Sequence, residues 1–265
     1  MANYVTDDAV CLRVTDFSET SQIVALLTRQ HGLVPMIAKG SKRQTKKGTT
    51  GTFSGPLDLL TAGQVVFLPA KGAAELATLA AWELTDHRTT LRTHLPALEA
   101  AMLMTEITLG LLRPLDPHAD LWEQFDVTLQ LLPGPQRLRV IVAYAKSALT
   151  VAGFQPQLDA CLVCGQPIVP EAEYRFIPLA GGVFCPDCPT PSAGGGKNNV
   201  RLVVSGKIIV ALERLADPLQ LRENPPERPA DPAALKTALQ ILLAQIEATI
   251  DRPLRTRAVV DQLFR

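Results

Sequence analysis

Four of the five cysteines form two pairs with the spacing of metal ligands. Two residues separate Cys161 from Cys164 and Cys185 from Cys188, and 20 residues lie between the pairs. A tetrahedral zinc ion takes four thiolates at about 2.3 Å, and a two-residue spacer lets one tight turn supply two of them. Because four thiolates leave no open coordination position, the pattern predicts a structural zinc site. The alternative is four ordinary reduced thiols, while the isolated Cys11 is expected to be a small core residue.

Sequence motifs of covalent catalysis are missing. The chain contains no G-x-x-x-x-G-K-[ST], G-x-G-x-x-G or G-x-S-x-G pattern, and its four histidines share no metal or triad spacing. We interpret the histidines and the pair Asp7-Asp8 as solvated side chains. A zinc hydrolase is disfavoured because four cysteines would close the coordination sphere. The sequence therefore predicts a protein that is not an enzyme.

The formal net charge is zero, with 26 Lys and Arg against 26 Asp and Glu, but the charges are unevenly spread. The total excludes only a uniformly basic protein. No acid lies between Glu19 and Asp58, whereas six cations do. Five of these cations fall within nine residues: Lys39, Lys42, Arg43, Lys46 and Lys47. We predict that this basic segment contacts the phosphate groups of a nucleic acid. The alternative is that it is a solvated surface loop.

The elements that must position these residues begin with β patterns in the first 80 residues. Candidate strands are residues 10–14, 23–27, 33–38, 57–60, 65–68 and 76–84. His31-Gly32 predicts a hairpin turn, and Pro35 indicates an edge position or a bulge. Short strands at this spacing in about 80 residues, with a long polar loop at 40–55, fit a small five-stranded barrel of the OB type.

After residue 81 the pattern becomes helical. Helices are expected over residues 96–112, 118–132, 136–151, 205–215 and 231–249, with loops at 193–199 and 222–232. Ser205 and Asp231-Pro232 are helix-start signals, and Gly153 is a stop signal. The fold class is therefore α+β, with several domains.

Several segments resemble the family of bacterial RecO recombination mediators. In the N-terminal region these are Val10-Cys-Leu-Arg-Val-Thr-Asp-Phe-Ser-Glu-Thr20, Thr28-Arg-Gln-His-Gly-Leu33 and Ala38-Lys-Gly-Ser-Lys-Arg43, followed by Leu76-Ala-Thr-Leu79 with Glu83. Gly153-Phe-Gln-Pro-Gln-Leu-Asp-Ala-Cys-Leu-Val-Cys-Gly165 is similar to the family segment that leads into a zinc knuckle. The resemblance covers about residues 8–190. Some family members lack the zinc cysteines, so the quartet indicates a zinc-bearing branch.

The resemblance implies an N-terminal OB-fold β-barrel followed by an α-helical domain with an inserted four-cysteine zinc knuckle. The expected boundaries are 1–82 for the DNA-binding barrel, 83–157 and 200–265 for the two parts of the helical domain, and 158–190 for the knuckle. The family's function implies binding of single- and double-stranded DNA and annealing of complementary strands. It also implies contact with the acidic C-terminal tail of the single-strand-binding protein and, with RecR, help in loading RecA onto coated strands.

In this interpretation the five clustered cations track the DNA backbone. Phe53, just past them, is the best candidate for base stacking, and the alternative is that it fills the barrel core. The acidic tail is expected in a hydrophobic groove of the helical domain, where Arg137 and Arg139 are candidate edges. A competing function is a zinc-containing adaptor that assembles proteins without direct DNA contact.

Composition also bears on location. Five cysteines are too few for a secreted disulfide scaffold, and the acidic N-terminal segment lacks the positive charge of a signal peptide. The stretch 95–112 comes closest to a membrane span, but Glu99 and Glu106 interrupt it. We expect a protein of the bacterial cytoplasm, associated with the nucleoid.

Overall fold

A computed structural model describes residues 3–43, 53, 55–70, 75–191, 200–227 and 230–258. The chain divides into two units. The first consists of Met1–Thr93 and Leu112–Asp126, and the second of His94–Leu111 and Val127–Arg265. The domain boundaries expected from the sequence remain predictions.

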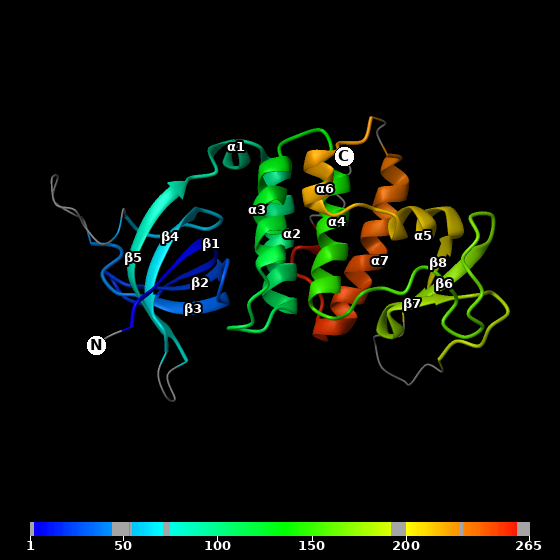
Figure 1. The fold of residues 1–265 in the computed structure, drawn as a ribbon, viewed down its shortest axis with the longest axis horizontal. Coiled ribbons are helices and arrows are strands. Elements are labelled where there is room, and N and C mark those ends of the chain that lie inside the picture. The colour runs from blue at the N-terminus through cyan, green and yellow to red at the C-terminus, as the bar shows by residue number, and fades with distance from the viewer. Residues whose placement is uncertain are drawn as a thin grey trace. The chain divides into compact units, whose positions relative to one another are not determined.

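Five strands of the first unit close into a barrel (Figure 1). They are β1 (Val5–Asp16), β2 (Gln22–Thr28), β3 (Gly32–Ala38), β4 (Ala62–Leu68) and β5 (Ala77–Asp86). Their order is β1-β2-β3-β5-β4, and only the β3–β5 pairing is parallel. The OB-like barrel predicted from the sequence is confirmed.

The barrel core is built from alternate side chains of these strands. Val24, Leu26, Met36 and Phe67 are among its buried members. Cys11 is fully buried in β1, and burial raises the pKa of its thiol to about 12, so it is the inert core residue expected.

One apolar run predicted as a strand is not a strand. Residues 57–58 have no regular secondary structure and residues 59–60 form a turn, and Leu57 and Leu60 are buried. Leu60 has a positive φ of 64° and donates its N–H to the carbonyl of Cys11 at 2.7 Å. The run is apolar because the turn itself packs into the core.

At Gly32, the turn of the β2–β3 hairpin lies in close contact with the backbone of Asp116. A Cβ at this position would lie 2.1 Å from the carbonyl oxygen of Asp116, and φ is +69°. The N–H of Leu115 donates to the carbonyl of Leu33 at 2.9 Å. Glycine therefore lets residues 112–126, which lie in the same unit, pack against the hairpin. The short helix α1 (Thr89–Arg92) follows β5 in this unit.

The second unit is built on three helices that contact one another: α2 (Leu95–Leu111), α4 (Arg137–Val151) and α7 (Pro232–Ile250) (Figure 1). The shorter α5 (Gly206–Glu213) and α6 (Pro218–Glu223) pack against α7 and α4 respectively. Helix α3 (Ala119–Leu131) begins in the first unit and ends in the second. Four of the predicted helices begin and end within about one residue of their expected positions, and α5 ends two residues before its expected end.

By length and composition, α7 is one helix of the described chain that could cross a membrane. Its central residues, however, are buried within the second unit, from Ala238 to Ile246 with the exception of Gln240. This is the character of a core helix.

The second unit also contains a small antiparallel sheet that we did not predict. Its strands are β6 (Glu173–Ile177), β7 (Gly182–Phe184) and β8 (Leu202–Ser205), in the order β7-β6-β8, with the one-turn helix η1 (Pro178–Ala180) between β6 and β7. Helix α6 was also missed. It begins at Asp217-Pro218 with a capping box to Gln220, the same Asp-Pro signal that we read correctly at α7.

Candidate metal centre and nucleic-acid interface

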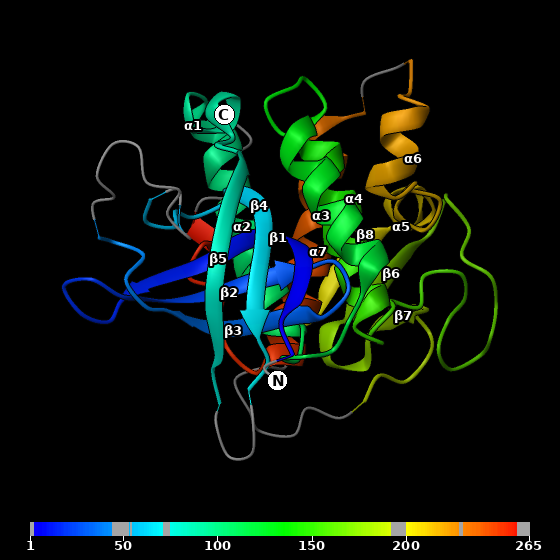
Figure 2. The same ribbon diagram turned by 60° about the vertical axis from the view of Figure 1, so that its left-hand side comes forward.

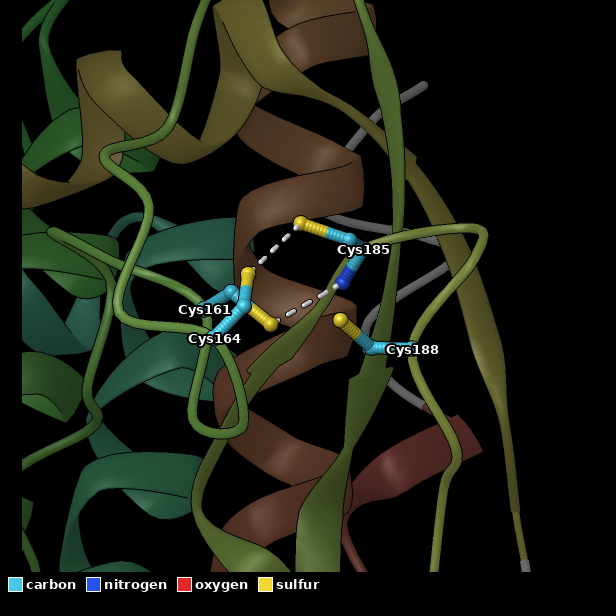
Figure 3. A group of neighbouring side chains, drawn as sticks. All are labelled: Cys161, Cys164, Cys185 and Cys188. Carbon is cyan, nitrogen blue, oxygen red and sulfur yellow. Dashed lines mark hydrogen bonds between the residues drawn. The ribbon is translucent and has the colours of Figure 1, made fainter.

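The four paired cysteines come together beside the small sheet. Their Sγ atoms all lie within 4.8 Å of one another, and Figure 3 shows the side chains of the two pairs turned toward each other. Each pair closes a tight turn: the N–H of Gly165 donates to the carbonyl of Cys161 at 3.0 Å, and the N–H of Cys188 to that of Cys185 at 3.2 Å. The arrangement is a pair of knuckles that can hold one metal ion.

Strand β7 positions both knuckles. The second knuckle begins directly after the strand, at Cys185. The first is attached by the N–H of Leu162, which donates to the carbonyl of Val183 at 2.9 Å. Gly182 permits this approach, because a Cβ there would lie 2.6 Å from a methyl group of Leu162.

Backbone donors prepare Cys161 to be a thiolate. Burial raises the pKa of this thiol, but the N–H groups of Cys164, Cys185 and Val163 face its sulfur and outweigh burial, so the pKa falls to about 6. One of these bonds, from the N–H of Cys185, measures 3.3 Å.

The neighbouring sulfurs act in the opposite direction on the second knuckle. Burial and the sulfurs of Cys161 and Cys164 raise the pKa of Cys185 to about 12. The same neighbours and burial raise the pKa of Cys188 to about 11, with Cys164 the largest influence. Several thiolates at this separation repel one another, so a bound cation would replace the protons. The donor set fits a metal that prefers sulfur and tetrahedral geometry.

Arg175 on β6 supports the second knuckle, a role that we did not predict from the sequence. Its Nη2 lies 2.6 Å from the carbonyl oxygen of Cys185, 2.9 Å from that of Pro186 and 2.6 Å from that of Cys188. The guanidinium therefore holds the backbone of the turn between the two cysteines. No motif indicates this role; only the β6–β7 pairing, which sets Arg175 opposite Phe184, brings the side chain there.

Three of the five clustered cations lie at the turn that follows β3. Lys39 and Arg43 are exposed, and Lys42 is half-buried with its Nζ 2.9 Å from Oδ2 of Asp16. Such exposed ion pairs contribute little to stability. Lys46 and Lys47, predicted to act with them, lie outside the described residues. Three of the five predicted cations are therefore seen to share one turn of the barrel.

A buried polar network holds this turn. The hydroxyl of Ser41 donates to Oε1 of Gln22 at 2.9 Å, and the N–H of Leu57 donates to the same oxygen at 3.0 Å. In return, Nε2 of Gln22 donates to the carbonyl of Leu57 at 3.2 Å. A second tie is the N–H of Lys42, which donates to the carbonyl of Thr20 in the β1–β2 turn at 3.1 Å.

The side chain of Phe53 is not displayed on the surface for stacking on a base. Phe53 is partly buried against the barrel core and forms an isolated parallel bridge with Trp82 of β5. Of the two interpretations left open by the sequence, the structure supports the one in which Phe53 fills the barrel.

Some of the acidic and histidine side chains that we interpreted as solvated are in fact paired. Asp7 is buried, accepts the N–H of Gln30 at 2.9 Å, and lies 2.7 Å from Nδ1 of His31. It therefore ties β1 to the β2–β3 turn. His94 contacts Arg137 at 3.1 Å.

The fold and the cysteine cluster define a class of protein: an OB-like barrel followed by a helical unit that carries a four-cysteine site. Two family models match the chain, "Recombination protein O N terminal" over residues 1–88 and "Recombination protein O C terminal" over residues 92–258. The chain belongs to the RecO family of DNA repair proteins.

Curated relatives agree with this assignment. The protein named "DNA repair protein RecO" from Anaeromyxobacter sp. (strain K) is 31% identical over 255 residues, which cover 96% of this chain and 94% of that one. The protein of the same name from Moorella thermoacetica is 26% identical over 258 residues, covering 97% and 90% of the two chains.

The support from Arg175 can be tested through metal retention. Arg175→Met should weaken the hold of the cluster on a bound metal ion by roughly ten- to a hundredfold, because the backbone of the second knuckle loses its hydrogen bonds to the guanidinium. Competition with a coloured chelator measures this, with Arg201→Met, an exposed arginine of the same unit, as the control. Equal retention by the two variants would show that Arg175 does not support the site.

Proposed function

We propose that this RecO-family chain binds single- and double-stranded DNA through the turn after β3 and anneals complementary strands. With RecR, it helps RecA load onto strands coated with single-strand-binding protein. The observation that carries the proposal is the shared turn of Lys39, Lys42 and Arg43 on the OB-like barrel of a chain in a DNA repair family. The work is done by binding, with no covalent step, in the bacterial cytoplasm at the nucleoid.

Phosphate attraction explains how a chain of zero net charge can do this. Each lysine or arginine that meets a phosphate releases condensed counterions, so the affinity falls as salt rises. Lys39, Lys42 and Arg43 share one turn of the barrel, which would limit the contact to one region of the surface. The pair between Lys42 and Asp16 is exposed enough to open when a phosphate competes for the ammonium group.

The DNA contact is tested by changing Lys39, Lys42 and Arg43 together to Ala. Single-strand affinity should fall, and the slope of log affinity against log salt should flatten by about 2, since each phosphate contact contributes roughly 0.7 to the slope. A fluorescently labelled oligonucleotide titrated at several salt concentrations measures both quantities.

A matched triple variant carries Arg201→Ala, Lys207→Ala and Arg222→Ala, three exposed cations of the second unit. It has the same change in net charge and should keep the wild-type slope. Wild-type affinity and slope in the first variant would show that Lys39, Lys42 and Arg43 do not hold the DNA. Failure of the unsubstituted chain to bind the oligonucleotide at low salt would instead favour a protein-assembling adaptor without DNA contact.

We further propose that the metal held by Cys161, Cys164, Cys185 and Cys188 is a structural Zn²⁺. Four sulfur donors in two knuckles suit zinc, and they leave no position for a substrate or an activated water. Bound zinc would supply fold stability to the loops beside β7 rather than chemistry. Metal analysis should find one zinc ion per chain; Cys188→Ser should lose it, and Cys11→Ala should retain it.

The acidic tail of the single-strand-binding protein is proposed to bind a cavity of about 410 Å³ between α4, α5 and α7. The lining is mainly apolar, with Leu212, Leu215 and Leu235 among its residues, and Arg139 and Arg214 contribute positive charge. This combination suits a tail that carries both apolar and acidic groups. Of the two arginines considered from the sequence, only Arg139 is among the residues that line this cavity, whereas Arg137 donates to the carbonyl of Leu132 at 2.9 Å.

Arg139→Ala should weaken binding of a synthetic acidic tail peptide by about tenfold or more, because a charge-assisted contact is lost beside an apolar cavity. Fluorescence anisotropy of the labelled peptide measures the change. Arg222→Ala, on α6 but outside this cavity lining, is the control. Unchanged peptide affinity in Arg139→Ala would place the tail elsewhere.

A further inference from the structure

The turn between β1 and β2 carries an exposed phenylalanine. Phe17 is 62% exposed, whereas Phe67 of the same unit is buried and Phe53 packs against the core. Single exposed apolar side chains are common on protein surfaces, so the significance of this ring lies in the turn that carries it and in the neighbours of that turn. Figure 2 shows the β1–β2 turn, in dark blue, reaching outward from the strands it joins.

Hydrogen bonds within the turn hold this residue in place. The N–H groups of Phe17 and Ser18 both donate to the carbonyl of Ser21, at 3.0 and 3.2 Å. The hydroxyl of Ser18 accepts the N–H groups of Thr20 and Ser21, at 3.4 and 3.2 Å. The ring is therefore presented on an ordered turn, so that little conformational freedom is lost when a ligand covers it.

The same turn is joined to the cationic turn after β3. The carbonyl of Thr20 accepts the N–H of Lys42 at 3.1 Å, and the hydroxyl of Ser21 accepts the N–H of Gly40 at 3.4 Å. Asp16, the residue before Phe17, pairs with the ammonium group of Lys42. The turn that carries the exposed ring and the turn that carries Lys39, Lys42 and Arg43 are therefore direct neighbours on the barrel.

We propose that Phe17 stacks on an unpaired base while the neighbouring cations hold the phosphates, and that this contact favours single-stranded over duplex DNA. Barrels of this type bind oligonucleotides through the loop between their first two strands, and aromatic rings serve there as sequence-tolerant platforms. A paired base keeps its faces inside the duplex stack, so only a single strand offers one. The inference rests on the DNA binding proposed above and assigns it a base contact.

The test compares the full-length protein with Phe17→Ala on three oligonucleotides of equal length: oligo-dT, an abasic strand with the same phosphates, and a duplex. Phe17→Ala should lose about 5- to 150-fold in affinity for oligo-dT and change little on the abasic strand and the duplex. The salt dependence of binding should stay as in the wild type, because no phosphate contact is removed.

Tyr4→Ala is the matched control, because Tyr4 is 58% exposed but lies at the opposite end of β1. It should bind all three oligonucleotides as the wild type does. Phe17→Trp should restore oligo-dT affinity, and its added fluorescence should be quenched by oligo-dT but not by the abasic strand.

The outcomes separate this inference from the proposed function. Equal losses by Phe17→Ala on oligo-dT and on the abasic strand, or no loss on either, would overturn the stacking and leave DNA binding by the cations intact. Failure of the unsubstituted protein to bind any of the three oligonucleotides would overturn the proposed function, and the stacking with it.

Discussion

The side-chain amide of Gln22 joins three segments of the first unit that lie far apart in the sequence. It stands at the start of β2, accepts a hydrogen bond from Ser41 in the turn after β3, and exchanges two more with the backbone of Leu57. Because the amide is buried, each of these bonds forms in a low-dielectric environment, and losing a partner would leave an unsatisfied polar group. The position of the cationic turn therefore depends on this network, and so does its tie to the β1–β2 turn.

In the second unit, a guanidinium group holds the backbone of the metal site. The two cysteine knuckles are short turns, and they bring four sulfur atoms within 4.8 Å of one another. Arg175 reaches from the middle strand of a small sheet to three carbonyls of the second knuckle, while β7 holds the first. A sulfur-binding cation would complete this arrangement, since it would compensate the repulsion between the neighbouring thiolates.

The parts of this structure that could be predicted are those encoded by local signals. The cysteine spacing predicted the four-sulfur cluster, and Asp231-Pro232 predicted the start of α7. The barrel followed from short apolar runs separated by turn residues. Residues 57–60 show the weakness of that signal, because an apolar run is equally compatible with a turn that packs into a core. The remaining features depend on partners that are distant in the sequence. Gln22 and Leu57 are 35 residues apart, and Asp7 meets His31 across 24 residues, so neither could be recognised as a structural residue from its neighbours.

The most direct test of the central claim is the annealing of complementary strands that are both coated with single-strand-binding protein. We predict that the chain accelerates annealing and that the Lys39, Lys42 and Arg43 triple alanine variant loses most of this acceleration. An adaptor that only assembles proteins would not bring the strands together. No acceleration by the wild-type chain, or full acceleration by the triple variant, would contradict the proposed function.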